Sequence, residues 1–290
     1  MRRTVRALVR RHPIACFGLL AYALSWADWI ALAVRGARVA AGGHVTHFPG
    51  LLGPAVAALV VVALRDGRPG LRQLVGRLGR VSRPTPRFLA YALSPLGFLA
   101  LALAILRLSG GTLPSPGEFA LYSGLPPLPL AVTVVLVLVF NGYGEETGWR
   151  GFALAPLQAR FGAVRGTLLL ALLWAGWHAP LFGVVETYRG MGSAALIGGF
   201  GLGLCAGAVV LARVASRTDG SILAAALWHT TYNLGSATAA GRGVVAAVTT
   251  TCVMVWAVWL LLLEWRRPLE RSRLAVRPAG TPASIPRGAA

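Results

Sequence analysis

Long apolar runs dominate this chain and restrict it to a small set of folds. Of its 290 residues, 56% are hydrophobic and only 13% are charged, whereas a soluble domain carries about 25% charged residues. A helix needs about 20 residues to cross a bilayer, and lipid offers no partner for an open sheet edge. The runs predict an all-α, polytopic membrane protein with about eight transmembrane helices, at approximately 14–34, 49–64, 88–106, 128–147, 166–184, 193–213, 221–238 and 244–263.

The arginines give the predicted helices an orientation. All 28 basic residues are Arg, and a cytoplasmic N-terminus puts 23 of them on the cytoplasmic side and five on the other. This is the bias that the positive-inside rule describes. Eight spans bring the chain back to the side where it began, so we expect both termini in the cytoplasm. The net charge of +19 predicts contact with an anionic inner leaflet, and we find no motif for binding nucleic acid.

The chain divides into four predicted parts. Residues 1–127 hold the first three helices, 128–238 hold the helices that carry buried polar residues, and 239–265 form the last helix. The remainder, 266–290, is rich in Arg, Pro, Ala and Gly, a composition that buries too little apolar surface to fold. We expect a disordered basic tail there.

Two adjacent acids, Glu145 and Glu146, stand at the end of the fourth predicted span, and Arg150 follows one turn later. The chain has only nine acidic residues. A carboxylate near hydrocarbon depth is costly, so it usually faces a partner or a watery cavity and has a function there. The i,i+4 spacing of Glu146 and Arg150 also fits a simple ion pair at a helix end.

Three further polar residues lie inside predicted spans: His178 in the fifth, and His229 with Asn233 in the seventh. His178 lies about 18 Å and His229 about 12 Å from the cytoplasmic ends of their helices. Together with the glutamates they could meet in the cytoplasmic half of the bilayer if these helices pack together. Their depths differ, so we expect a re-entrant cavity or a tilted, broken fourth helix, which its glycines would permit.

Taken together, these residues can support hydrolysis. A carboxylate and a neutral imidazole can hold and deprotonate a water molecule, and a second His with an Asn can stabilise an oxyanion. No Ser or Cys is placed as an obvious nucleophile, which favours amide hydrolysis by water. A membrane histidine also commonly bonds one helix to another, so interhelical contacts remain an alternative interpretation of both histidines.

The three motifs resemble those of a known family. Glu145-Glu146-xxx-Arg150, Trp174-xxx-His178 and His229-xxx-Asn233 resemble the motifs of the CAAX-processing and bacteriocin-processing (CPBP, or Abi) membrane proteases. The second motif commonly has Phe where this chain has Trp174. The resemblance covers about residues 128–238 and implies that Glu145 and His178 activate water and that His229 and Asn233 stabilise the oxyanion, while Glu146 and Arg150 support them.

Metal dependence is a separate question. The resemblance and the residues favour a metal-independent, glutamate-dependent intramembrane endopeptidase with no cofactor. The alternative is a zinc protease in which Glu145, His178 and His229 bind the ion, since two His and one carboxylate form an acceptable ligand set. A His-Glu-x-x-His helix, the usual zinc motif, is missing from the sequence.

Two other classes of function are open at this stage. A non-catalytic partner, such as a bacteriocin-immunity protein or scaffold, would not need Glu145 or His178 for its effect. A transporter would need polar residues across both leaflets, whereas these residues gather toward one side. We expect a multi-pass protein of the cell membrane with its active site toward the cytoplasm. Its substrate would be a membrane-proximal peptide or protein, and the sequence does not indicate whether that substrate is prenylated.

Overall fold

The computed structural model describes residues 2–268 and 271–276, and within them the chain is a bundle of helices without β-strands. Six helices in this part of the chain are long and apolar enough to cross a membrane, or seven if one bent pair counts as a span. The six are α2 (Pro13–Val34), α3 with α4 (Phe48–Arg65), the helix Leu130–Phe161, α12 with η3 (Ala163–Gly183), Gly198–Arg217, and α16 (Val244–Glu264). The predicted all-α, polytopic membrane fold is confirmed, but the described residues contain six or seven such helices where about eight were expected.

Two predicted spans differ from simple crossing helices. The third is α6 (Thr85–Ala92) followed by α7 (Ser94–Leu108), bent by 50° where Pro95 opens α7. The seventh is α15 (Ile222–Leu234), whose 13 residues measure about 20 Å, against a hydrocarbon core of about 30 Å. Gly235 ends this helix, so the predicted span of 221–238 was too long.

The fourth span is longer than predicted, and it is continuous. It runs over 32 residues, Leu130–Phe161, instead of ending at 147. Its segments are α9 (Leu130–Val137), η1 (Leu138–Tyr143), α10 (Gly144–Gly148), η2 (Trp149–Ala153) and α11 (Leu154–Phe161), of which η1 and η2 are π-helical. π-helical turns inside α-helices are frequent at functional sites. Of the two expected arrangements, a re-entrant cavity or a broken fourth helix, the break is not observed, because the chain stays helical through these glycines.

Those glycines serve close packing. A Cβ atom on Gly148 would lie 2.6 Å from Pro54 of α4, and one on Gly144 would lie 2.7 Å from the Leu51 carbonyl of α3 (Phe48–Leu51). On another face, a Cβ on Gly142 would lie 2.9 Å from the Ala226 carbonyl of α15. Gly lets neighbouring backbones approach closely in membrane bundles, so this helix is wedged between its neighbours at the position of the glutamates.

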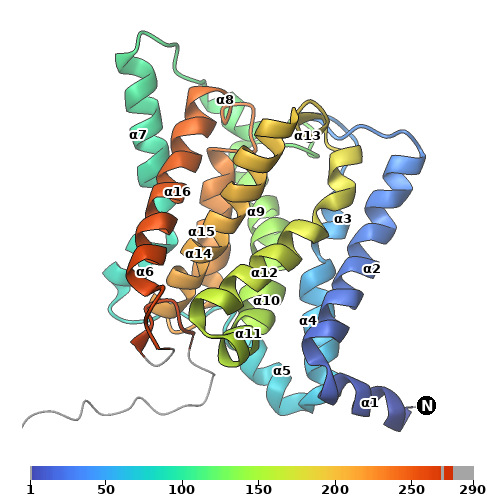
Figure 1. The fold of residues 1–290 in the computed structure, drawn as a ribbon. Helices are drawn as coiled ribbons and strands as arrows, with labels where there is room; N and C mark the ends of the chain where they lie inside the picture. Colours follow the sequence, from blue (N-terminus) through green and yellow to red (C-terminus); the bar gives the residue numbers. More distant parts are fainter. Residues whose placement is uncertain (1, 269–270, 277–290) are drawn as a thin grey trace, which may run out of the picture.

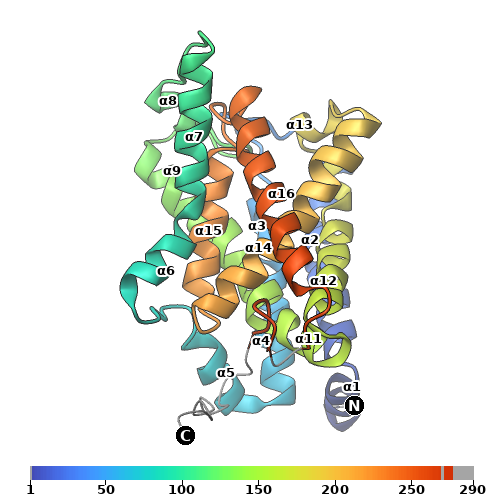
Figure 2. The ribbon, with the colours of Figure 1, turned by 60° about the vertical axis from the view of Figure 1, so that its left-hand side comes forward.

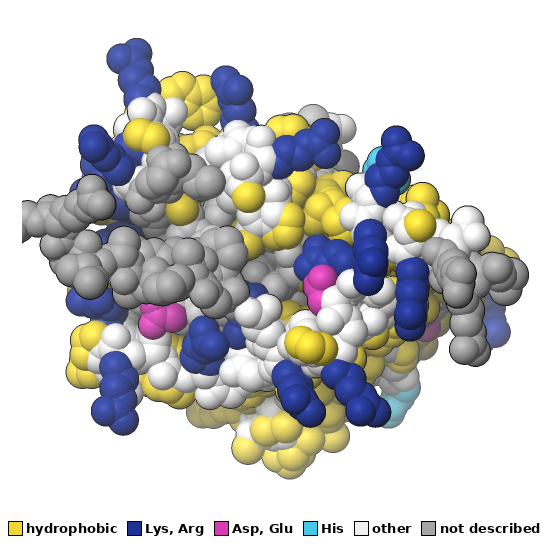
Figure 3. Space-filling model, turned by 90° about the horizontal axis from the view of Figure 1, so that it is seen from below, with side chains coloured by type: hydrophobic (Ala, Val, Ile, Leu, Met, Phe, Trp, Pro, Cys, Tyr) yellow, Lys and Arg dark blue, Asp and Glu magenta, His cyan; other side chains and the backbone are white. Residues whose placement is uncertain are grey.

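The connections gather at two ends of the bundle (Figure 1). One end holds α1 (Arg2–Arg11), α5 (Gly67–Val75) and α11, together with the described residues that follow α16, 265–268 and 271–276. The views in Figures 1 and 2 agree that α8 (Pro116–Ala120) and α13 (Glu186–Arg189) lie at the opposite end. The first end, called here the arginine-rich end, bears many Arg side chains and few acidic ones on the face shown in Figure 3.

The connections at the opposite end are joined to one another. Isolated β-bridges pair Val39 with Val185, Ala41 with Ser123, and Tyr122 with Thr238. These bridges give otherwise irregular backbone its hydrogen-bond partners. They also hold Tyr122 near the C-terminal end of α15, which carries polar residues described below.

Part of the predicted disordered tail is ordered. In the segment 271–276, the Leu274 carbonyl accepts a hydrogen bond from Gln158 Nε2, and the Val276 N–H donates to Gln158 Oε1, both at 2.9 Å. Leu274 is fully buried. The prediction of disorder from 266 is therefore wrong for residues 271–276, because a buried glutamine side chain pairs with this backbone. Residues 277–290 lie outside the described part.

Candidate active site

Glu146, Arg150 and His229 form a buried network between the fourth helix and α15. Glu146 Oε1 accepts hydrogen bonds from Arg150 Nη1 and from His229 Nδ1, each at 2.9 Å. Glu146 is fully buried and Arg150 is 1% exposed. A buried charge needs a partner because its desolvation is expensive, and here each charge has one. The Glu146–Arg150 pair thus lies inside the protein, and the helix continues past it.

Glu145 is held by a different partner. Its Oε2 accepts a hydrogen bond of 2.7 Å from the indole Nε1 of Trp174 on α12, and the side chain is 2% exposed. The two adjacent carboxylates therefore face different helices: Glu145 faces α12, and Glu146 faces α15. This separation gives the two acids different environments.

His178 follows directly after α12, where Pro180 begins the short 3-10 turn η3 (Ala179–Gly183). Its Nδ1 lies 2.7 Å from the Trp174 carbonyl oxygen. A carbonyl oxygen only accepts, so Nδ1 carries the proton, and Nε2 of the neutral ring is left as an acceptor. His178 thus presents a basic nitrogen away from the helix that holds it.

Asn233 is fixed by a residue that the sequence interpretation missed. Its Nδ2 donates a hydrogen bond of 3.0 Å to the hydroxyl of Tyr122, which is 2% exposed. Tyr122 lies 111 residues earlier, in the bridged connection at the opposite end. No pattern near Tyr122 marks it, because the contact depends on the tertiary fold alone.

Trp174 is the side chain that the other groups share. The guanidinium carbon of Arg150 lies 4.3 Å from the centroid of the indole ring. The rings of His178 and His229 each lie 5.7 Å from it, centroid to centroid. Residues of all three motifs therefore meet around Trp174. The sequence predicts such a meeting if these helices pack together.

Arg77 closes the arginine-rich side of this cluster. Its guanidinium donates hydrogen bonds of 2.7 Å to the carbonyls of Gly151 and Gly220, and a longer one of 3.3 Å to that of Arg150. The π-helical segment η2 contains two of these three carbonyls. Arg77 thereby ties the fourth helix to the start of α15 and supplies partners for backbone acceptors that would otherwise be buried without them.

Some polar atoms of the cluster have no protein partner among the described residues. They are Glu146 Oε2, Arg150 Nε and Arg150 Nη2. Unpaired buried polar groups are uncommon and costly, and they tend to occur where a protein handles water or substrate. Within the described residues, no three His, Cys, Asp or Glu side chains come together as a metal ligand set.

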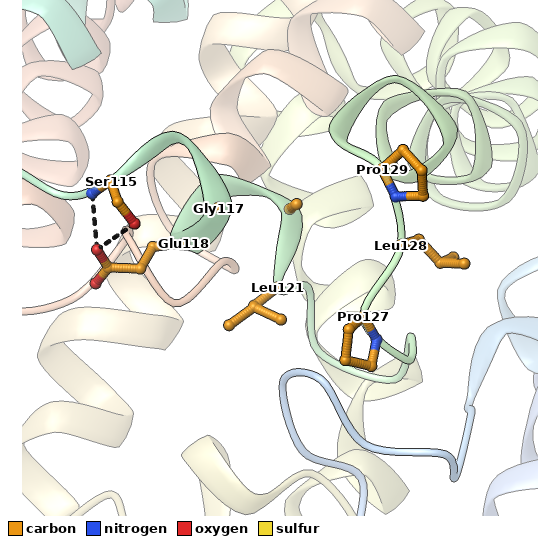
Figure 4. A pocket seen from close by; sticks show the side chains of 8 residues that line it. Ser115, Gly117, Glu118, Leu121, Pro127, Leu128 and Pro129 are labelled. Carbon is orange, nitrogen blue, oxygen red and sulfur yellow. Dashed lines mark hydrogen bonds between the residues drawn. The ribbon is translucent and has the colours of Figure 1, made fainter.

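A surface pocket of about 560 Å³ lies at the opposite end, between α8 and the start of α9 (Figure 4). Its lining includes Leu121, Pro127, Leu128 and Pro129, and it contains none of the clustered polar residues. Glu118 caps α8 there: the Ser115 backbone N–H, at 2.7 Å, and the Ser115 hydroxyl donate to its carboxylate. These bonds hold the pKa of Glu118 below its usual value, so this acid has a structural role.

The segment that contains these residues is similar to known proteins. Residues 127–235 match the family model described as type II CAAX prenyl endopeptidase, Rce1-like. CAAX prenyl protease 2 of Methanococcus maripaludis is 26% identical over 144 residues, which cover 49% of this chain and 51% of that protein. The chain thus spans about half the length of this curated relative. The similarity to the type II CAAX prenyl endopeptidases, Rce1-like, thus lies in residues 127–235, the segment that carries the clustered polar residues.

Proposed function

We propose that this protein is an intramembrane endopeptidase that hydrolyses a peptide bond with a water molecule activated by Glu145 and His178. The observation that carries the proposal is the orientation of the two histidines around a buried carboxylate. The Nδ1 atoms of His178 and His229 are both engaged, at 2.7 and 2.9 Å. Each ring therefore leaves Nε2 as the nitrogen that can act on water or substrate.

The reaction begins with proton transfer from water. Glu145 accepts a proton while the water oxygen bonds to the carbonyl carbon of the substrate, and Nε2 of His178 accepts a hydrogen bond from the same water. The tetrahedral intermediate then collapses as its C–N bond breaks, and Glu145 returns the proton to the leaving amine. Water is consumed, and the products are a carboxylic acid, which then loses its proton to solvent, and an amine.

His229 and Asn233 stabilise the oxyanion of that intermediate. Glu146 lies at Nδ1 of His229, and its negative charge favours a doubly protonated ring whose Nε2–H donates to the oxyanion. One N–H of the Asn233 amide is engaged by Tyr122, and the second is available for the same oxygen. Arg150 balances the charge of Glu146.

We further propose that the reaction does not need a metal ion. Support comes from the lack of a three-residue ligand set in the described part of the chain and from the use of Glu146 as a partner of His229. If zinc were bound, Glu145, His178 and His229 would be its ligands, and zinc would supply a Lewis acid for water activation. Metal analysis of the purified protein tests this: stoichiometric zinc, with activity lost to chelator and restored by zinc, would favour the metalloprotease.

The proposed setting is the cell membrane, with the arginine-rich end in the cytoplasm against anionic lipid. Counted from Leu130, Glu145 lies about 22 Å along its helix, past the middle of a hydrocarbon core of about 30 Å. This depth supports a site in the cytoplasmic half, if the helix enters the core at Leu130. The predicted substrate is a peptide or protein segment near the membrane.

The decisive experiment uses a quenched-fluorescence peptide that ends in farnesyl-Cys-Val-Leu-Ser, with the unprenylated peptide in parallel. Purified protein in detergent should cleave at least one of them, and Glu145→Ala and His178→Ala should lower kcat by at least 100-fold. Glu186→Ala is the matched control, because Glu186 is an exposed carboxylate at the opposite end. Equal cleavage by wild type and Glu145→Ala would refute the mechanism, and a biological effect that Glu145→Ala retains would favour the immunity or scaffold alternative.

A further inference from the structure

Trp174 contacts both members of the water-activating pair, through two different groups. Its indole N–H donates to Glu145 Oε2, and its backbone carbonyl accepts from His178 Nδ1, both at 2.7 Å. The side chain is 6% exposed. A hydrogen bond to an ionised acceptor is shorter and stronger than a neutral one, so the indole fixes one oxygen of Glu145 and with it the direction of the other.

The Trp174 carbonyl can accept a hydrogen bond from His178 Nδ1 because α12 ends nearby. In a continuing α-helix, the Trp174 carbonyl would accept from the backbone N–H of residue 178. That N–H instead donates to the Ala175 carbonyl at 3.1 Å, as the chain tightens into the 3-10 turn. The Nδ1 atom of His178 donates to the Trp174 carbonyl in place of that backbone N–H.

The indole ring is itself held in place. The Arg150 guanidinium lies over its face at 4.3 Å, a cation–π contact that gains strength when water is excluded. His178 and His229 flank the ring at 5.7 Å. The orientation of the N–H is thus determined by packing on several sides, as positioning a carboxylate requires.

We propose that Trp174 is a positioning residue of this enzyme, whose indole N–H orients Glu145 for proton transfer. The inference rests on the proposed function, because it assigns Trp174 its role through Glu145. The part of Trp174 that matters is then the N–H bond. A side chain with a similar ring and no N–H should fill the space and leave Glu145 without its orienting donor.

The test compares three proteins with the farnesylated peptide. Trp174→Phe should lower kcat by about 10- to 100-fold, the range expected for a lost hydrogen bond to a charged group, with KM within about twofold of wild type. Trp228→Phe is the matched control. Trp228 is 1% exposed, and its Nε1 donates to Ser94 Oγ at 3.1 Å, so this variant also loses one buried N–H bond, without contact to Glu145.

Equal losses of kcat in the two variants, or an unchanged kcat in Trp174→Phe, would overturn the inference. If Trp174→Phe does not fold, benzothienylalanine at position 174 replaces it, since sulfur takes the place of the N–H in a ring of nearly the same shape. That variant should show the same loss of kcat, and an unchanged kcat would again overturn the inference.

A second measurement is independent of catalysis. In protein labelled with ¹⁵N at the indole nitrogens, the Trp174 signal is identified by its loss in Trp174→Phe or in the benzothienylalanine protein. It should shift in Glu145→Gln, where the acceptor becomes a neutral amide, while the Trp228 signal stays in place. If wild type cleaves no peptide, the proposed function fails, and this signal still decides the contact: a Trp174 resonance unmoved by Glu145→Gln would rule it out.

Discussion

Arg150 is a buried charge that depends on its neighbours for stabilisation. Its side chain is 1% exposed, and it depends on Glu146 and on the face of Trp174. Removing one partner of a buried ion pair leaves the other charge uncompensated, which is more damaging than replacing both. The pair was visible from its spacing in the sequence. The burial of the pair could not be predicted from the sequence. It depends on the fourth helix continuing past residue 147, where its end was expected.

Arg150→Met should therefore destabilise the protein strongly, by about 3 to 5 kcal/mol, since it leaves Glu146 buried opposite His229 alone. The double variant Glu146→Gln/Arg150→Met should recover part of that loss, because no buried charge is then unmatched. Thermal unfolding in detergent measures both. Arg165→Met removes an exposed arginine and should leave the Tm close to that of wild type; equal Tm losses for the single and double variants would contradict the prediction.

Tyr122→Phe tests the contact that the sequence did not reveal. Loss of the hydroxyl frees the Asn233 amide to rotate, and kcat should fall by about threefold to tenfold, as expected for one neutral hydrogen bond. Tyr143→Phe is the control, because the Tyr143 hydroxyl bonds to the Leu78 carbonyl at 2.9 Å and does not contact the cluster. A kcat unchanged in Tyr122→Phe would mean that Asn233 is positioned without it.

At the scale of elements, the fourth helix shows what sequence patterns can and cannot predict. The apolar run located this helix, and the acids and the arginine mark the part of it that contacts α12 and α15. The glycines were misinterpreted, because Gly breaks helices in water but supports close packing in a bundle. Which of these roles applies depends on neighbours such as Pro54 and the Leu51 carbonyl, and these come from another part of the chain.

Gly148→Ala should therefore be destabilising, since its Cβ would lie 2.6 Å from Pro54 atoms on α4. We expect a lower Tm and reduced activity, because α10 would have to move with Glu145 and Glu146. Gly97→Ala in α7 is the matched control: a Cβ there meets nothing within 4 Å, and Ala favours helix over Gly by about 1 kcal/mol. A Gly148→Ala protein as stable as Gly97→Ala would refute this account of the packing.

For the molecule as a whole, the alternation of arginine-rich and arginine-poor connections agrees with the fold. The arginine-bearing helices α1, α5 and α11 lie together at one end of the bundle (Figure 1). The number of full-length spans could not be predicted as well, because the run at 221–238 was interpreted as a full span, whereas α15 is only 13 residues long. The bridged connections at the opposite end left no local pattern, so their role in holding Tyr122 required the structure.

Cysteine labelling tests the orientation of the whole bundle. In a protein whose Cys16, Cys205 and Cys252 are replaced by Ser, a membrane-impermeant maleimide should label Ser109→Cys in intact cells and not Gly79→Cys. Both positions are exposed, Ser109 at the end of α7 and Gly79 at the arginine-rich end. Permeabilised cells should label both, which is the control. Labelling of Gly79→Cys alone in intact cells would invert the proposed topology.

The continuous fourth helix also makes the protein sensitive to the thickness of its membrane. Its 32 residues measure about 48 Å, well beyond a hydrocarbon core of about 30 Å. Such a helix must tilt or project from the bilayer, and its tilt changes with lipid chain length. The depth at which Glu145 meets a substrate is then set partly by the surrounding lipid. The same sequence would hold the Glu145 carboxylate at different depths in thin and thick membranes.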